Sequence, residues 1–328
     1  MNRVLMSATA LFFALAGGQA YAVDAASTIN DATLTAPKSA KYSPALVKAQ
    51  ILLDRAHFSP GVIDGYSGAN VRRAVAAYAR ANNIASAGAL NEAVWNSLTA
   101  SAASAITSYT ITAADVQGPF LKSVPKDDIT AMSKLTALSY TSPREALAEK
   151  FHMSESLLAA LNPGADFSKA GAQISVASVN STPLAGEVAT IRVNKGTNSV
   201  SAFDASNKLI GYFPATVGSS DRPAPSGTWA VQSVAFNPAY YYNPDRLTFG
   251  EGVAIGKLKV AAGPNNPVGD VWIDLTKDTY GIHGAPDPQL VGKVASHGCV
   301  RLTNWDSTTL AKATKAGVKV EFVGEERF

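Results

Sequence analysis

One cysteine and two histidines near the C-terminal end of the chain have the residue types and spacing of a nucleophilic thiol site. Cys299, the only cysteine among 328 residues, closely follows His297, and a second histidine, His283, stands further upstream. The thiolate is the reactive form of cysteine, and a neighbouring imidazolium lowers the thiol pKa, which is ordinarily about 8.5. A lone thiol with two histidines therefore predicts covalent catalysis through sulfur.

The neighbours of these residues supply the other parts that acyl transfer needs. Gly284 and Gly298 let the backbone approach a substrate closely. The backbone N–H groups of Gly298 and Cys299 are candidate donors to an oxyanion. Arg301 places a permanent positive charge two residues after the cysteine, where it suits a substrate carboxylate. Two further residues are expected to line the site, Tyr280 and Ser296.

A mainly β domain is predicted to position this chemistry. From residue 187 onward, short runs rich in β-branched and aromatic residues, such as 190–193 and 271–275, alternate with Gly and Pro. That texture predicts a sandwich-like or barrel-like domain over residues 187–324. A helix is expected from 306 to 316, with Thr303 or Asn304 as its cap.

The motifs of residues 187–323 resemble the catalytic domain of the YkuD-type L,D-transpeptidases. The family pattern is His-Gly, a spacer, then Ser-His-Gly-Cys with an apolar residue and Arg or Asn. This chain carries His-Gly at 283–284, Ser-His-Gly-Cys-Val-Arg-Leu at 296–302, Pro-Ser-Gly-Thr-Trp at 225–229, Asn-Pro-Val-Gly at 266–269 and Thr-Asn-x-Asp at 303–306. Several spaced matches in the right order are far more specific than a bare His-Gly-Cys.

The resemblance implies a role for each motif residue. Cys299 is the nucleophile, His283 its base, and the Gly284 carbonyl the group that orients the imidazole. His297 is expected to line the acyl pocket or to assist the oxyanion. The implied reaction is a ping-pong transfer. Cys299 attacks the diaminopimelate carbonyl of a donor tetrapeptide stem, D-alanine leaves and a thioester forms. An acceptor amine then captures the acyl group. No metal, nucleotide or other cofactor is implied, and carbapenems are the expected inhibitors.

Alternatives to this reading remain open at the level of sequence. Water in place of the amine makes an L,D-carboxypeptidase or hydrolase of the same fold. A zinc site formed by His283, His297 and Cys299 is disfavoured, because no acidic ligand or third histidine accompanies them at metal-site spacing. A non-catalytic peptidoglycan-binding scaffold is the third alternative. The acceptor (a stem peptide, a D-amino acid, a lipoprotein lysine or water) and the oligomeric state are not predicted.

The first residues predict export. Asn2 and Arg3 precede an apolar run over residues 4–16, and Ala20-Tyr21-Ala22 forms a small-x-small cleavage signature. We expect a signal peptide at 1–22, cleaved after Ala22, then a flexible leader at 23–42 rich in Ala, Thr, Ser and Lys. No other stretch approaches transmembrane length. The exported chain is therefore expected in the periplasm, without a membrane span.

Residues 43–98 predict a small all-α module of three helices. Apolar residues recur at helical spacing in 46–56, 69–78 and 91–98, and a Pro- and Gly-rich turn separates the first two helices. The run Phe-x-Pro-Gly-x-Ile-Asp-Gly at 58–65 and Trp-x-x-Leu at 95–98 resemble the three-helix peptidoglycan-binding domain. The resemblance implies contact with glycan strands; a helical spacer is the alternative.

A linker at 99–128 and a second small module at 129–180 are expected before the catalytic domain. Two short helices, an Asn-Pro-Gly stop at 162–164 and a run at 170–176 that is typical of a short strand after a turn follow in order. This order resembles a diverged LysM module, a short α/β unit that binds N-acetylglucosamine chains in its family. A structural spacer is the alternative reading of this segment.

Charge and composition exclude some functions. A net charge of +3 with 16% charged residues does not describe a nucleic-acid-binding chain, which concentrates Lys and Arg on one face. A hydrophobic content of 47% indicates a folded chain. The mild basic balance suits an anionic cell-wall polymer. The family resemblances described above, not the composition, imply the expected partners, which are peptidoglycan stem peptides and glycan strands.

Overall fold

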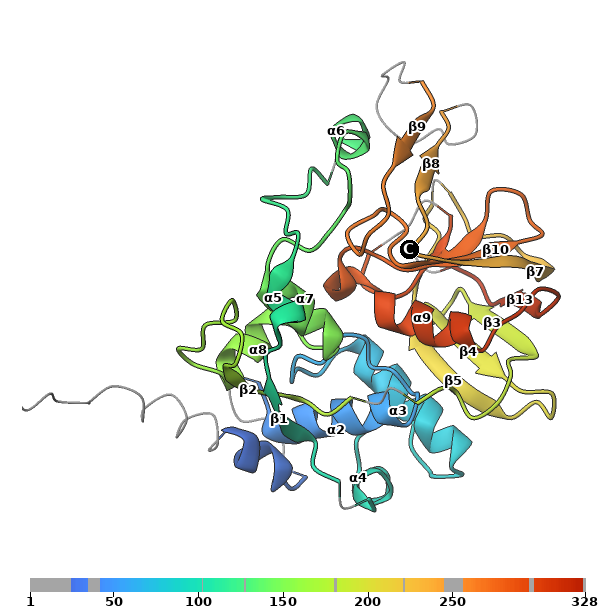
Figure 1. The fold of residues 1–328 in the computed structure, drawn as a ribbon. Helices are drawn as coiled ribbons and strands as arrows, with labels where there is room; N and C mark the ends of the chain where they lie inside the picture. The colour runs from blue at the N-terminus through green and yellow to red at the C-terminus, as the bar shows by residue number, and fades with distance from the viewer. Residues whose placement is uncertain are drawn as a thin grey trace, which may run out of the picture.

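The computed structural model describes residues 25–34, 42–101, 103–126, 128–179, 182–220, 222–244, 256–294 and 298–326. The predicted signal peptide lies outside these residues, and so do Ser296 and His297 of the predicted site. Within them, the chain builds a helical module, a mixed middle module and a sheet-rich module, in that order (Figure 1). The multidomain fold expected from the sequence is confirmed, with helices first and a mainly β part last.

The helical module consists of α2 (Pro44–Arg55), α3 (Ala69–Ala81) and α4 (Glu92–Thr99). Capping explains where two of them begin. The Ser43 hydroxyl accepts a hydrogen bond from the N–H of Leu46 at 3.4 Å, and the Asn91 side chain accepts one from Val94 at 3.0 Å. No helix among the described residues is long and apolar enough to cross a membrane.

Part of the predicted leader, 23–42, is ordered. Residues 25–30 are helical, and Ile29 is fully buried in the apolar core of the middle module. The Asn30 side chain makes two hydrogen bonds to the backbone of Ile106. Its amide donates to the Ile106 carbonyl at 3.0 Å, and its oxygen accepts from the Ile106 N–H at 2.8 Å. The expectation of a wholly flexible leader therefore fails here, because one apolar side chain and one amide find buried partners.

The middle module is a two-stranded antiparallel ladder with helices between its strands. β1 (Ile106–Thr110) pairs with β2 (Gln173–Ala177). Between them lie α5 (Ala113–Gln117), α6 (Ile129–Ser133), α7 (Pro143–Lys150) and α8 (Glu155–Leu161). β1 and α5 lie inside the stretch 99–128 that the sequence predicts to be a linker. The strand could not be recognised from this stretch alone, because the stretch is rich in small residues and the strand's pairing partner, β2, comes far later in the chain. The LysM-like assignment of 129–180 stays a prediction.

The sheet-rich module holds a nine-stranded mixed sheet among the described residues. In spatial order its strands are β5 (Leu209–Pro214), β4 (Ser199–Phe203), β3 (Thr190–Asn194), β13 (Lys319–Val323), β7 (Gly227–Phe236), β10 (Val271–Leu275), β11 (Gly281–His283), β12 (Val300–Arg301) and β6 (Thr216–Val217). A separate hairpin joins β8 (Tyr240–Tyr242) to β9 (Leu258–Val260). One apolar core unites residues from both ends of the sheet with α9 (Asn304–Lys312), which gives the module its sandwich-like character.

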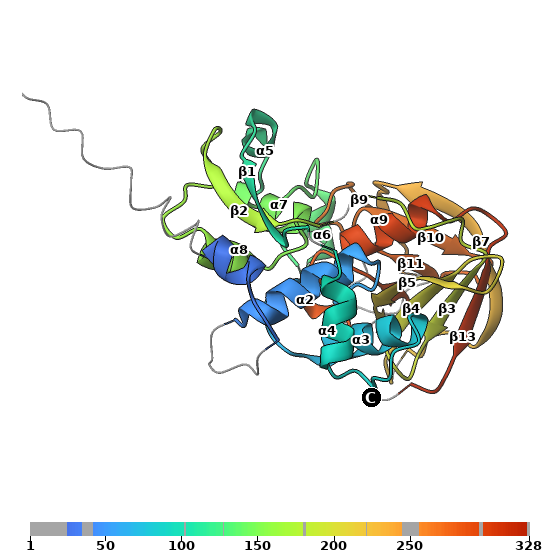
Figure 2. The same cartoon turned by 90° about the horizontal axis from the view of Figure 1, so that it is seen from below.

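A single loop of the helical module joins all three parts. Residues 57–64, here called the joint loop, extend the sheet beyond β5: Ser59 N–H donates to the Tyr212 carbonyl, and Tyr212 N–H to the His57 carbonyl, both at 2.8 Å. The same loop pairs with the middle module, because Ile63 N–H donates to the His152 carbonyl at 2.8 Å. Figure 2 shows α3 beside β5 on this side of the molecule.

The joint loop contains the residues that carry the resemblance to peptidoglycan-binding domains. Phe58 is 6% exposed and Ile63 is fully buried. The Gln50 side chain fixes the end of the loop by accepting from the N–H of Gly65 at 2.7 Å. The apolar side chains of the loop are therefore buried in contacts between modules, where they are not accessible to a glycan strand.

Candidate active site

Two parallel strands bring the predicted reactive residues together. β11 and β12 pair so that His283 lies opposite Arg301 and Ile282 opposite Val300. Because side chains alternate along a strand, His283 and Arg301 share one face, and Cys299, two residues before Arg301, belongs to that face as well. All three line the same cleft. Strand pairing therefore unites residues from two distant motifs of the chain.

The imidazole of His283 is held in one orientation. Its Nδ1 lies 2.7 Å from the Gly284 carbonyl oxygen. A carbonyl can only accept, so Nδ1 carries the proton and Nε2 keeps its lone pair. The Trp272 ring stacks on the imidazole, with centroids 5.4 Å apart and planes 23° from parallel. The ring is thus presented as a neutral base with Nε2 available to accept a proton.

Burial keeps both reacting groups neutral in the resting protein. It lowers the pKa of His283 to about 3, and the positive charge of Arg301 acts in the same direction. Burial also raises the pKa of the Cys299 thiol, against a backbone hydrogen bond at Gly281 and the charge of Arg301. The sequence-based expectation that an imidazolium lowers the thiol pKa is therefore not met. The resting pair is a thiol and a neutral imidazole.

The backbone beside the thiol is strained. Thr279 has φ +69°, a left-handed conformation that is rare for a β-branched residue. Its carbonyl accepts a long hydrogen bond from the Cys299 Sγ at 3.8 Å. Such a conformation costs about 1–3 kcal/mol and persists where surrounding structure imposes it. Sequence analysis missed Thr279, because no local pattern marks a non-glycine residue with positive φ.

Two of the predicted glycines are required by their neighbours. Gly298 has φ +106°, and a Cβ there would stand 3.2 Å from the Tyr280 ring. A Cβ on Gly284 would stand 2.3 Å from the Asn304 side-chain oxygen. Any side chain at 298 or 284 would therefore displace the turn before Cys299 or the carbonyl that orients His283.

Asn304, at the start of α9, supports the strand ends behind the site. Its oxygen accepts from the N–H of Asp270 at 3.2 Å, and its amide donates to Glu149 of α7 at 3.0 Å. Glu149 is 8% exposed, and burial raises its pKa to about 8. A polar chain thus runs from the middle module to the backbone next to Gly284.

A second buried polar cluster ties α9 to the helical module. The Ser59 hydroxyl donates to Asp306 at 2.9 Å, and burial raises the pKa of Asp306 to about 7. His152 contacts Asp54 at 2.9 Å and stacks on Trp305, with ring centroids 5.0 Å apart. Burial opposes the charge on His152, but the Asp54 carboxylate outweighs it and raises the pKa of the ring. His152 is therefore a structural residue, remote from the cleft lining.

The cleft is large enough for a peptide. Its volume is about 2220 Å³, above the range of about 300–1,000 Å³ typical of small-molecule pockets. Predicted site residues Tyr280, His283, Cys299 and Arg301 line it. Other lining residues were not foreseen from sequence: Thr216, Arg222, Tyr240, Thr279, Asp287 and, from the middle module, Val124, Lys126, Ile129 and Met132.

Within the described part of the chain, no three His, Cys, Asp or Glu side chains are grouped so as to hold a metal ion. Ser296 and His297 lie outside that part, so their predicted roles stay predictions. The described residues place a thiol (Cys299), a neutral base (His283) and a guanidinium (Arg301) in one open cleft. That set suits acyl transfer through sulfur.

Comparison with known families agrees with this chemistry. A family model described as "L,D-transpeptidase catalytic domain" (YkuD) matches residues 189–322. A second, described as "Putative peptidoglycan binding domain", matches residues 42–98. The matched ranges correspond closely to the sheet-rich and helical modules.

Individual relatives carry related names. The Bacillus subtilis protein named "Putative L,D-transpeptidase YqjB" is 32% identical over 150 residues, covering 44% of this chain and 76% of that protein. The Escherichia coli protein named "Probable L,D-transpeptidase YbiS" is 25% identical over 190 residues, covering 56% of this chain and 61% of that protein. Among solved structures, an L,D-transpeptidase (Yku) from Stackebrandtia nassauensis aligns over 90% of this chain and 98% of that one, at 13% identity and a TM-score of 0.35.

Proposed function

The chain belongs to the L,D-transpeptidase family, and from that premise we propose that it cross-links or modifies peptidoglycan by cysteine acyl transfer. Cys299 is the nucleophile, His283 the base, and the donor is a tetrapeptide stem that ends in D-alanine. The observation that carries the proposal is the β11–β12 pairing, which sets His283 opposite Arg301 and gives Cys299 the same cleft.

Acylation begins from the neutral pair. As Sγ of Cys299 attacks the diaminopimelate carbonyl that bears D-alanine, the thiol proton passes to Nε2 of His283. Burial lowers the pKa of His283, so the resting imidazole is neutral and its Nε2 keeps a lone pair at neutral pH. The negative charge that develops on the substrate during the attack favours protonation of the ring. The Nδ1 hydrogen bond to Gly284 keeps the ring aligned while it becomes charged.

The tetrahedral intermediate needs donors for its oxyanion. The N–H groups of Gly298 and Cys299 are the candidates, and the positive φ of Gly298 sets the direction of this turn. Collapse of the intermediate breaks the carbon–nitrogen bond. The imidazolium returns its proton to the departing amine of D-alanine, which leaves a thioester on Cys299 and a neutral His283.

Deacylation repeats the steps with an acceptor amine. His283 takes a proton from the amine as nitrogen attacks the thioester carbonyl, and the thiolate then leaves and is reprotonated by the imidazolium. The Arg301 guanidinium is proposed to hold a carboxylate of the stem. His297 would line the acyl pocket, and Ser296 and Tyr280 its walls. No cofactor enters any of these steps.

The setting of the reaction is also proposed. Residues 1–22 would direct export to the periplasm, with cleavage after Ala22. The helical module would keep the enzyme near glycan strands, using faces other than the joint loop. The thiol would be acylated by carbapenems, the inhibitors that the family resemblance implies.

The test is mass spectrometry of purified tetrapeptide muropeptides incubated with the protein lacking residues 1–22, with Cys299→Ala as the matched blank. Cross-linked dimers that lack one D-alanine, absent from the blank, are expected. Tripeptide without dimers would instead identify a carboxypeptidase or a different acceptor. Unchanged muropeptides would overturn the proposal and favour a binding scaffold.

A further inference from the structure

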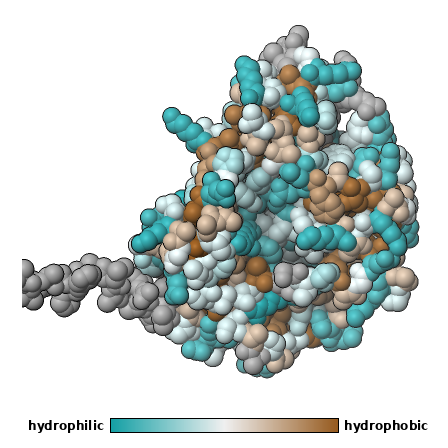
Figure 3. All heavy atoms as spheres, in the orientation of Figure 1, coloured by the Kyte–Doolittle hydropathy of each residue, from teal (hydrophilic) through white to brown (hydrophobic). Residues whose placement is uncertain are grey.

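Part of the middle module forms a wall of the catalytic cleft. The segment that runs from residue 118 to 139 leaves the two-stranded ladder and packs on the β8–β9 hairpin, so that α6 lies beside β9 (Figure 1). Met132 and Leu138 are buried there against Val260 of β9. In Figure 3, brown apolar surface lies among polar side chains in the upper part of the molecule, where Figure 1 places α6 and β9.

Specific hydrogen bonds fix this wall. Leu138 N–H donates to the Ala262 carbonyl, and Asn265 N–H donates to the Leu138 carbonyl, both at 2.9 Å. A Cβ on Gly263 would stand 2.4 Å from that same carbonyl, so the two backbones are in close contact. The segment is therefore built onto the catalytic module.

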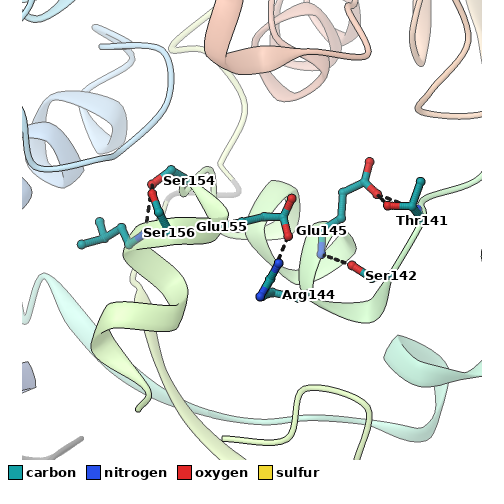
Figure 4. A network of polar contacts seen from close by, with 8 residues as sticks. Thr141, Ser142, Arg144, Glu145, Ser154, Glu155 and Ser156 are labelled. Atoms are coloured by element: carbon teal, nitrogen blue, oxygen red, sulfur yellow. Dashed lines mark hydrogen bonds and ion pairs between the residues drawn. The ribbon is translucent and has the colours of Figure 1, made fainter. Parts of the chain in front are cut away.

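The end of the segment is held by Glu145 at the start of α7. One carboxylate oxygen accepts from the N–H of Thr141 at 2.5 Å, and the other accepts from the Asn265 side chain at 2.9 Å. Figure 4 shows Glu145 reaching Thr141 next to the Arg144–Glu155 ion pair that joins α7 to α8. These contacts make the wall a fixed part of the substrate cleft.

An ion pair spans from this wall to the loop that follows β11. Lys126 of the segment contacts Asp287, which follows His283 by four residues, and both side chains line the cleft that holds Cys299. The Lys126 side chain is 56% exposed and that of Asp287 is 35% exposed. Exposed ion pairs add little to stability, so a ligand bearing both charges can replace this pair at small cost.

We propose that Lys126 and Asp287 together recognise the free amino-acid end of diaminopimelate in the donor stem. This inference rests on the proposed function. In the donor, the second centre of diaminopimelate carries an ammonium and a carboxylate, at the end of a short methylene chain from the carbonyl that Cys299 attacks. Lys126 would bind the carboxylate and Asp287 the ammonium, each in exchange for its present partner. The middle module thereby determines donor specificity.

The experiment measures the first half-reaction alone, so that the acceptor plays no part. The rate constant for acylation of Cys299 is followed by intact-protein mass for two tetrapeptide stems. One has the free carboxylate at the second centre of diaminopimelate, and the other has that carboxylate amidated. The variants are Lys126→Ala, Lys126→Arg and, as a matched control, Lys134→Ala, an exposed lysine of the same segment outside the cleft lining.

Lys126→Ala is expected to slow acylation by the free-acid stem up to about fivefold, the upper value for one exposed ion pair, and to change the amidated stem less than about 1.5-fold. Lys126→Arg should recover most of the loss, and Lys134→Ala should match the wild type. Equal losses with both stems would assign Lys126 a structural role and overturn the proposal. Absence of any acylation in the wild type would overturn the proposed function itself.

Discussion

Replacing Arg301 by glutamine is expected to raise the pKa of both reacting groups. The guanidinium charge favours the thiolate of Cys299 and disfavours the imidazolium of His283, so it lowers both values in the native protein. Without it, the thiol becomes harder to ionise and the imidazole easier to protonate. The two groups thus shift in the same direction on the pH scale, although the charges on their ionised forms are opposite.

The size of the effect follows from the fraction of thiolate. A thiol of ordinary pKa, about 8.5, is about 10% ionised at pH 7.5, whereas an ion-paired thiol of pKa about 6 is almost fully ionised. Burial raises the pKa of Cys299, so its ionised fraction at pH 7.5 should lie below about 10%. Each further unit of pKa in Arg301→Gln lowers that fraction about tenfold, or about 1.4 kcal/mol.

The assay is the rate of Cys299 alkylation by iodoacetamide between pH 6 and 10, followed by intact mass. The chain has one cysteine, so the adduct that is absent from Cys299→Ala reports this thiol. Arg222→Gln, which removes another arginine of the cleft lining, is the matched control and should leave the profile unchanged. A wild-type midpoint below about pH 8 would refute the neutral resting pair. A lower midpoint in Arg301→Gln would refute the assigned role of the guanidinium.

Three further predictions concern the framework of the site. Gly298→Ala should lower kcat/KM for muropeptides at least about 100-fold, because a Cβ would contact the Tyr280 ring and reorient the backbone N–H groups proposed to bind the oxyanion. Near-normal turnover would contradict this prediction. From pH 6.5 to 8, Glu149, of pKa about 8, is protonated in the fold but ionised when unfolded. The unfolding free energy should therefore fall with pH, by up to about 1.4 kcal/mol per unit, and Glu149→Gln should flatten that fall in urea titrations; an unchanged slope would count against the raised pKa. Ile63→Ala, in the joint loop, should cost about 2–5 kcal/mol by urea denaturation, whereas Tyr66→Ala, 50% exposed, should stay within about 0.5; equal losses would argue against the loop as a structural joint.

Residue types and local spacing in the sequence are enough to select Tyr280, His283, Cys299 and Arg301, which the structure brings to one cleft; their chemical roles stay predictions. Cys299, His283 and Gly298 could be chosen before any fold was known, and Thr303, one of the two residues expected to cap the C-terminal helix, does cap α9. These features depend on neighbours in the chain, which a sequence displays directly.

Features that depend on burial or on distant contacts could not be read in the same way. The neutral state of His283 comes from the walls around it. The joint loop lies in the part of the chain that matches a putative peptidoglycan-binding domain, yet its Phe58 and Ile63 are buried between modules. The cleft wall around Lys126 has no periodic pattern, and its partners lie more than a hundred residues later. Nothing local in the sequence distinguishes these cases.

Direct detection of the acyl-enzyme tests the central claim most closely. The protein is mixed with a tetrapeptide stem in the absence of added amine, quenched with acid, and its intact mass and peptide map are recorded. The account predicts an adduct on Cys299 equal to the stem without its terminal D-alanine, absent from Cys299→Ala. Release of D-alanine with no adduct on Cys299, or an adduct on another residue, would contradict it.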